Sequence, residues 1–256
     1  MDFITAAATD IGLTKQTNQD SFGVKVMNTG IGKVVLAVLC DGMGGLSKGE
    51  VASATVVDAF SKWANDRLPY LCSGNDLKQE ELASDWNSLV TQCNERIKAY
   101  GARNGVSCGT TITALLLTQK EYVTLNVGDS RSYEITGAAR QLTKDQSVVG
   151  REIELGILTE EQAKVDPRRS VLLQCIGASE TVVPDIGSGE IQKDAVYFLS
   201  SDGFVHEITS QEMQQNLNAQ LMGSKDQMCR NLTAMIELNK QRMESDNISV
   251  VAIRTL

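Results

Sequence analysis

The chain is poor in the residues that build zinc clusters and redox centres. Its 256 residues include one histidine, and its six cysteines are scattered without a C-x-x-C pair. Zinc clusters and redox-active dithiols need closely spaced Cys and His ligands, so this spacing argues against both. We expect the cysteines to be buried free thiols in a reducing, cytoplasmic protein.

Positive charge and long apolar runs are also lacking. The chain carries 24 Lys and Arg against 32 Asp and Glu, which gives a formal net charge of −8. This balance argues against nucleic-acid and anionic-membrane partners, whereas bound divalent cations could still admit a phosphorylated substrate. No apolar run approaches the roughly 20 residues of a spanning helix, and the first residues lack a basic and apolar leader pattern.

What is present suits a globular fold of mixed secondary structure. With 42% hydrophobic and 22% charged residues, and no internal repeat, low-complexity tract or linker, residues 1–256 are expected to form one domain. Apolar and β-branched runs predict strands at residues 21–26, 33–40, 110–118, 122–127, 132–136, 140–143, 171–176, 182–191, 195–200 and 248–255. Helical spacing predicts helices at residues 50–68, 82–97, 210–221 and 224–243.

The order of these elements predicts the fold class. Strands come in blocks and helices in pairs, instead of alternating one for one as in parallel units. We therefore predict an α+β fold, an antiparallel β-sandwich of two stacked sheets with helix pairs outside. In the first helix the predicted buried side carries Ala54, Val57, either Phe60 or Ser61, and Ala64. Residues 144–170 are polar, with a short helix at 159–165, and such a long connection is typical of a flap beside a site.

Acidic residues recur at the ends of the apolar strands. Residues 35–40 run directly into Asp41 and Gly42, and a buried carboxylate at a strand end is costly unless a cation compensates it. The other acidic residues placed in this way are Asp20, Asp129, Asp202 and Asp246. One such aspartate would be an ordinary turn or cap residue, but five placed alike indicate hard oxygen ligands for Mg²⁺ or Mn²⁺. Two such ions could drive hydrolysis of a phosphate ester.

Six short motifs carry a resemblance to a known family. They are Thr9-Asp10-x-Gly12-x-x-Lys15-x-x-Asn18-Gln19-Asp20, Asp41-Gly42-Met43-Gly44-Gly45, Gly109-Thr110-Thr111, Gly128-Asp129-Ser130-Arg131, Ser201-Asp202-Gly203 and Asp246-Asn247. Their order resembles that of the metal-dependent PPM/PP2C protein phosphatases of bacteria and spans almost the whole chain. Each motif alone is weak, but the ordered set makes a chance match improbable.

The resemblance implies a site and a ligand set. Asp41 would bridge two Mn²⁺ or Mg²⁺ ions, and Gly42 would offer its carbonyl. Asp202 and Asp246 would hold one ion, Asp20 would act on the other, and Asp129 with Asp202 would hold a third. Residues 156–159 and 166–169 also resemble the usual sequence of the family's flap.

Three residues depart from the family pattern. Lys15 stands where an arginine grips the substrate phosphate, so the charge remains but the bidentate fork is lost. Its alternative is a solvated loop lysine. Gln19 stands where a glutamate binds metal, and its amide either coordinates through oxygen or fixes the turn by hydrogen bonds. Met43 stands where some members place a histidine thought to protonate the leaving group, which leaves the acid unassigned.

Four further polar residues are given structural roles. His206, four residues after Asp202, is interpreted as a surface or cap residue at a helix start. Arg131 is expected to orient Asp129 or a loop, and Asp145 and Glu152 are expected to face solvent.

Three functions follow as hypotheses. The leading one is a phosphoprotein phosphatase acting on phosphoserine and phosphothreonine with Lys15 and Asp41 as catalytic residues, whose partners are a Ser/Thr kinase or its targets. The second is a regulatory module that binds a phosphoprotein or kinase after losing catalysis, which the two departures at Lys15 and Gln19 favour. The third, a nuclease, is disfavoured by the acidic charge and by the lack of aromatic and basic stripes.

Overall fold

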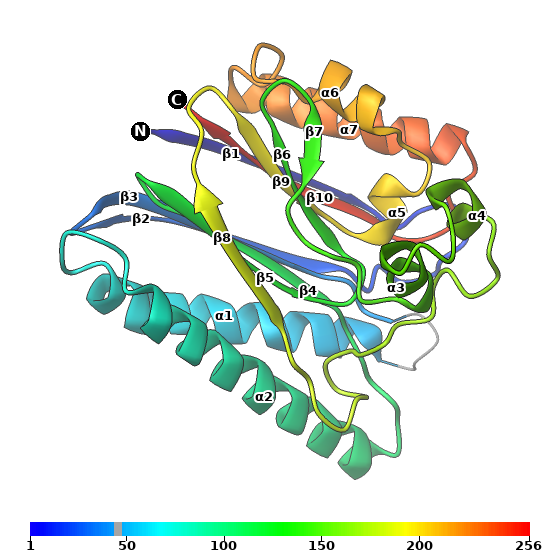
Figure 1. Ribbon diagram of the computed structural model, residues 1–256. Helices are drawn as coiled ribbons and strands as arrows, with labels where there is room; N and C mark the ends of the chain where they lie inside the picture. The colour runs from blue at the N-terminus through cyan, green and yellow to red at the C-terminus, as the bar shows by residue number, and fades with distance from the viewer. Residues whose placement is uncertain (44–47) are drawn as a thin grey trace.

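The structure is a computed structural model that describes residues 1–43 and 48–256 (Figure 1). Within the described residues, two antiparallel five-stranded sheets stack face to face. One sheet has the order β1 (Phe3–Asp10), β10 (Ile248–Thr255), β9 (Val196–Ser200), β6 (Arg131–Ile135) and β7 (Ala139–Gln141). The other has the order β2 (Ser21–Thr29), β3 (Gly32–Cys40), β4 (Ile112–Leu117), β5 (Glu121–Val127) and β8 (Asp185–Glu190).

Helices cover the outer face of each sheet. The pair α1 (Gly49–Leu71) and α2 (Gln79–Asn104) covers the sheet of β2 to β8, while α6 (Ser210–Asn216) and α7 (Lys225–Gln241) cover the other (Figure 1). The short helices α3 (Val148–Glu154), α4 (Glu160–Lys164) and α5 (Asp202–Val205) lie together at one end of the sandwich. The predicted α+β sandwich is confirmed. None of the described helices has the length and apolar character that a membrane crossing requires.

Strand β3 shows why its sequence is apolar without interruption. Val35, Ala37 and Leu39 point between the two sheets and pack against residues such as Leu199 of β9. The alternate side chains of β3 instead pack under the helices, against Phe60, Trp63 and Trp86; they are Val34, Leu36, Val38 and Cys40. Because both faces of β3 are buried, neither series can be polar.

The two long helices differ in how well their buried sides were predicted. In α2 the apolar residues spaced at three and four positions face the core: Leu82, Trp86, Cys93 and Ile97 are buried and Leu89 is partly buried. In α1 the predicted side is wrong at Ala54, which is exposed, because the buried positions run through Ala52, Val56 and Phe60. Val57 is only partly buried. Weak apolar contrast along this alanine-rich helix leaves the register to be decided by packing on β2 and β3.

The segment between β7 and β8 differs from the predicted secondary structure at two places. Residues 171–176 were predicted as a strand but form only isolated bridges, Ser147 to Leu172 and Thr110 to Ile176, and Val171 and Leu173 are exposed. An apolar run whose alternate side chains find no core has no reason to extend a sheet. Helix α3 was not predicted; it begins after Ser147, whose side chain accepts a hydrogen bond from the Gly150 amide.

Strand register brings the acidic motifs to one end of the sandwich. The start of β2 pairs with the end of β3, since Ser21 faces Cys40. In the other sheet the start of β10 pairs with the end of β9, since Val250 faces Ser200. The segments that carry the predicted ligands therefore leave both sheets at the same end.

Candidate functional site

Five aspartates gather where the strands end. Asp20 precedes β2, Asp41 follows β3, Asp129 lies two residues after β5, Asp202 opens α5, and Asp246 lies just before β10. Burial, followed by the negative charges of the other four, raises the pKa of Asp41 well above its usual value. The five carboxylates that the sequence predicted are therefore neighbours in space.

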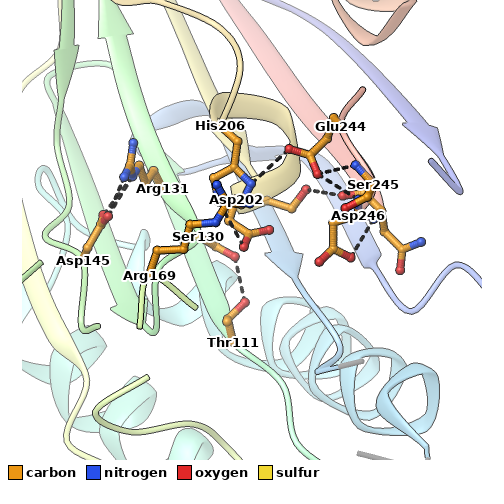
Figure 2. Close-up of polar contacts among 12 residues, drawn as sticks. Thr111, Ser130, Arg131, Asp145, Arg169, Asp202, His206, Glu244, Ser245 and Asp246 are labelled. Carbon is orange, nitrogen blue, oxygen red and sulfur yellow. Dashed lines mark hydrogen bonds and ion pairs between the residues drawn. The ribbon is translucent and has the colours of Figure 1, made fainter. Parts of the chain in front are cut away.

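The backbone of Asp41 is fixed by the Gly109-Thr110-Thr111 motif. The Asp41 amide donates to Thr111 Oγ1 (3.0 Å), and its carbonyl accepts from the Thr111 amide (2.9 Å) and from Thr110 Oγ1 (2.8 Å). Thr111 Oγ1 is in turn 2.8 Å from Ser130 Oγ, next to Asp129 (Figure 2). The two threonines thus hold the end of β3 against the turn that carries Asp129. Gly44 and Gly45, the last residues of the Asp41 motif, lie outside the described residues.

The loop between β1 and β2 is tied to Asp246 and its neighbour. Asn247 Nδ2 donates to the carbonyls of Ile11 (2.9 Å) and Thr17 (3.2 Å). Gly12 has φ +78°, and a Cβ there would collide with the Asp246 carbonyl, so both its backbone angle and its position require glycine. This closure carries Lys15 to the site, where its Nζ lies 2.7 Å from Asp246 Oδ1.

Gln19 points toward helix α1. Its Nε2 donates to Glu50 Oε2 at 3.3 Å. Its main chain holds the turn, because the carbonyl accepts from the Gly42 amide (3.2 Å) and from Ser53 Oγ (2.6 Å). A Cβ on Gly42 would meet the Gln19 carbonyl, which explains the glycine at this close approach. These contacts fix the turn, while metal coordination by Gln19 stays a prediction.

Several carboxylate oxygens at this end lack hydrogen-bond donors. Both oxygens of Asp20 and Oδ1 of Asp202 are buried and receive no hydrogen bond from the described residues. Burial is the main cause that raises the pKa of Asp20 to about 7 and that of Asp129 to about 8, and the charge of Asp202 adds to both. The hydroxyls of Ser249 and Ser201 offset part of the effect at Asp20 without forming a full hydrogen bond.

These orphaned oxygens fit a hard divalent cation. Buried carboxylates need either donors or positive charge, and a cluster of hard oxygens suits Mg²⁺ or Mn²⁺. In the part of the chain that the structure describes, no three Asp, Glu, His or Cys side chains already converge on one point as a finished ligand set. The fold brings the predicted ligands together, and small side-chain movements would have to complete the set.

Of the two roles predicted for His206, surface or cap residue, the structure shows the cap, in a half-buried position. It caps the C-terminal end of α5, not a helix start, and its ring lies between two carboxylates (Figure 2). Nδ1 is 3.1 Å from Glu244 Oε2, and Nε2 is 3.4 Å from Asp202 Oδ2. Burial alone would lower the pKa of His206, but the charges of Asp202 and Glu244 outweigh it and raise that pKa to about 9. Glu244, 5% exposed, was missed because nothing in its sequence context marks it.

Arg131 was predicted to orient either Asp129 or a loop, and the structure shows that it orients a loop. Its guanidinium donates to both Asp145 oxygens, with the shortest bond 2.6 Å from Nη2 to Oδ2 (Figure 2). The expectation that Asp145 and Glu152 face solvent is only partly met, because both side chains are paired and are 16% and 23% exposed. Glu152 is paired with Arg168 Nη2 at 2.8 Å, inside residues 144–170. Both acids serve to shape this segment.

A cleft of about 1230 Å³ opens beside the aspartates. It runs from Asp129 and Asp202, between residues 144–170 on one side and the segment from α5 to α6 on the other. Arg169 lines it, and its positive charge acts on His206, so this arginine reaches toward the acidic cluster (Figure 2). Sequence reasoning noted the motif of Arg169 without giving the side chain a role.

The chain is similar in sequence and fold to known protein phosphatases. The family model described as protein phosphatase 2C matches residues 13–241. A protein phosphatase 2C-type protein of Streptococcus pyogenes is 31% identical over 248 residues, which cover 96% of this chain and 94% of that protein. The solved serine/threonine phosphatase Stp1 of Staphylococcus aureus has a TM-score of 0.85 at 26% identity, covering 100% of this chain and 96% of that one.

A further solved structure bears on the metal. The catalytic domain of the serine/threonine phosphatase PstP, in complex with two manganese ions, has a TM-score of 0.78 at 27% identity, and the match covers 98% of this chain and 97% of that one. Fold, motif order and sequence similarity agree over nearly the full length. The chain therefore belongs to the protein phosphatase 2C family.

Proposed function

We propose that this chain is a metal-dependent phosphatase that hydrolyses phosphoserine and phosphothreonine in proteins. The observation that carries the proposal is a group of five neighbouring aspartates, in which Asp20 and Asp202 have buried oxygens without donors and Asp129 and Asp202 line a cleft. Such a group has no stabilising role of its own, because carboxylates that repel one another and lack donors cost free energy. Its retention is explained by cations that bind there during catalysis.

The proposed ligand set is the one that the family resemblance implies. Asp41 would bridge two ions together with the Gly42 carbonyl, with Asp202 and Asp246 on one side and Asp20 on the other. Asp129 and Asp202 would hold a third ion. When bound, Mn²⁺ or Mg²⁺ would supply Lewis acidity toward the phosphoryl oxygens and lower the pKa of water.

The chain's own cations would orient the substrate. Lys15 lies against Asp246 at the edge of the acidic cluster, where its ammonium could hold a phosphate oxygen as a point charge. Arg169 lines the cleft together with Asp129 and Asp202. Met43, half-buried beyond Gly42, offers no proton, so leaving-group protonation would fall to water or another side chain.

The remaining expectations belong to this proposal. Residues 1–256 would act as one catalytic domain with residues 144–170 as its flap. Phosphoproteins are the substrates that the activity requires, and a Ser/Thr kinase or its targets would be the partners, in the cytoplasm. The regulatory alternative gains no support from the site, because all five aspartates remain in place.

Exchange of a single carboxylate tests the proposal. We expect Asp41→Asn to abolish Mn²⁺-dependent phosphate release from a phosphothreonine peptide, because it removes the charge that would bridge two ions. Asp58→Asn is the matched control, since Asp58 is an exposed residue of α1 whose ion-pair partner among the described residues is Lys62. Full activity in folded Asp41→Asn protein would sink the proposal. Inactive wild-type protein that still binds a phosphoprotein tightly would favour the regulatory alternative.

A further inference from the structure

The single histidine of the chain links two segments that each carry a proposed metal ligand. His206 ends α5, which begins at Asp202, and Glu244 lies two residues before Asp246. Because a carboxylate can only accept, the 3.1 Å contact between Nδ1 and Glu244 Oε2 is a hydrogen bond donated by the ring. The other ring nitrogen, Nε2, faces Asp202 Oδ2 at 3.4 Å.

Glu244 in turn shapes the backbone that bears Asp246. Its Oε1 accepts from the amides of Ser245 (2.7 Å) and Asp246 (2.8 Å), while Oε2 is left for His206. With three donors, this buried carboxylate is well satisfied, unlike Asp20 and Asp202 nearby. Figure 2 shows the resulting chain of contacts from Asp202 through His206 and Glu244 to Asp246.

Main-chain contacts alone do not set the direction of the Asp202 carboxylate. Ser201 donates its amide to the Ser249 carbonyl at 3.0 Å, which holds the start of α5 against β10. Asp246 Oδ1 accepts from the Asn247 amide at 2.8 Å and lies 2.7 Å from Lys15 Nζ, whereas Asp202 Oδ1 receives no hydrogen bond from the described residues. Repulsion between like charges tends to turn such a side chain away from its neighbours. Among the described residues, the rigid His206 ring, which is hydrogen-bonded to the fixed Glu244 carboxylate, restrains Asp202 on the side that faces Asp246.

We propose that His206 and Glu244 are positioning residues that hold Asp202 and Asp246 in the arrangement needed to bind one metal ion together. The inference rests on the proposed function and assigns it two residues outside the ligand set. Partners that orient metal ligands typically contribute ten- to hundredfold to metal affinity. They touch neither the substrate nor the ion.

Substitutions can break the link without removing a proposed ligand. His206→Phe keeps a ring of similar size but has no hydrogen-bonding atom. Glu244→Leu removes the acceptor and leaves the two backbone amides unpaired. Glu244→Gln should preserve the link, because its carbonyl can accept from the amides and its NH₂ can donate to Nδ1 of a neutral ring whose Nε2–H then faces Asp202. Asp58→Asn again serves as the distant control.

Calorimetric titration of Mn²⁺ into metal-stripped protein measures the effect directly. We expect His206→Phe and Glu244→Leu to raise the Mn²⁺ Kd about ten- to hundredfold, and Glu244→Gln to stay within a few-fold of wild type. At saturating Mn²⁺ the KM for a phosphothreonine peptide should be unchanged, while the Mn²⁺ concentration for half-maximal rate rises. A loss caused by general instability would instead lower activity at every Mn²⁺ concentration.

Two results would overturn the inference in distinguishable ways. If wild type binds Mn²⁺ and turns over substrate while folded His206→Phe and Glu244→Leu bind with the wild-type Kd, the positioning role is wrong and the proposed function stands. If wild type itself binds no Mn²⁺ and releases no phosphate, both fail. Should His206→Phe not fold, His206→Leu, which also has no hydrogen-bonding atom, replaces it under the same criterion.

Discussion

At the scale of single residues, some site residues could be predicted from the sequence and others could not. Asp41 was recognisable because it ends an apolar run, and the structure explains Thr111 beside it as the holder of its backbone. Glu244 could not be recognised, because its partner His206 is 38 residues away and meets it only in the fold. A carboxylate that satisfies backbone amides leaves no pattern in the sequence.

Gln19 offers a prediction at this scale. Gln19→Glu places a carboxylate beside Glu50 in exchange for a 3.3 Å hydrogen bond. We expect the metal-free protein to lose about 1 kcal/mol of unfolding free energy through that lost bond and the new repulsion. If residue 19 lies in reach of an ion, the added charge should tighten Mn²⁺ binding.

Denaturant unfolding and calorimetric Mn²⁺ titration separate the two effects. Glu50→Gln in the Gln19→Glu background is the matched variant, because it removes the repulsion and should restore stability. Unchanged Mn²⁺ affinity in Gln19→Glu would restrict Gln19 to fixing the turn.

At the scale of elements, strands were easier to predict than the segment between β7 and β8. The strands of the sandwich have buried faces that impose apolar patterns, as both faces of β3 do. Residues 171–176 show the limit: their apolar run resembles a strand, yet Val171 and Leu173 are exposed. Local pattern cannot reveal whether a core is available to cover it.

We predict that the Arg131–Asp145 ion pair anchors residues 144–170 to the sheet. Asp145→Asn removes the charge from a pair joined by three hydrogen bonds and only 16% exposed at the Asp145 side chain. Hydrogen bonds between charged groups contribute about 1.5–3 kcal/mol. We expect faster amide hydrogen exchange in residues 144–170 and little change in the sheets.

Hydrogen exchange resolved by peptide is the measurement. Asp166→Asn is the comparison, because Asp166 pairs with Arg168 within the same segment and does not touch the sheets. Equal protection of residues 144–170 in wild type and Asp145→Asn would show that the anchor lies elsewhere.

At the scale of the whole molecule, the sandwich is a frame that forces acidic segments together. Strands of both sheets end at the same end of the sandwich. The register of β2 with β3 and of β9 with β10 places the acidic segments next to these strand ends. Packing between and outside the sheets offsets the repulsion that results. The cleft beside residues 144–170 gives this end access to solvent.

This arrangement predicts that divalent metal stabilises the protein. An ion that binds only the folded state adds about 2.7 kcal/mol of unfolding free energy at one hundred times its Kd. Mn²⁺ should therefore raise the melting temperature of metal-stripped wild type, and raise it much less in Asp41→Asn. Sodium chloride of equal ionic strength is the control, and an equal rise with sodium chloride would reduce the effect to screening.

Phosphate release from a phosphothreonine peptide, followed as Mn²⁺ is added to metal-stripped wild-type protein, is the most direct measurement. If the gathered aspartates form a metal-dependent phosphatase centre, the rate rises from background to saturation, falls to background with chelator and returns with excess Mn²⁺. A rate that is the same with chelator as with Mn²⁺ would contradict that claim.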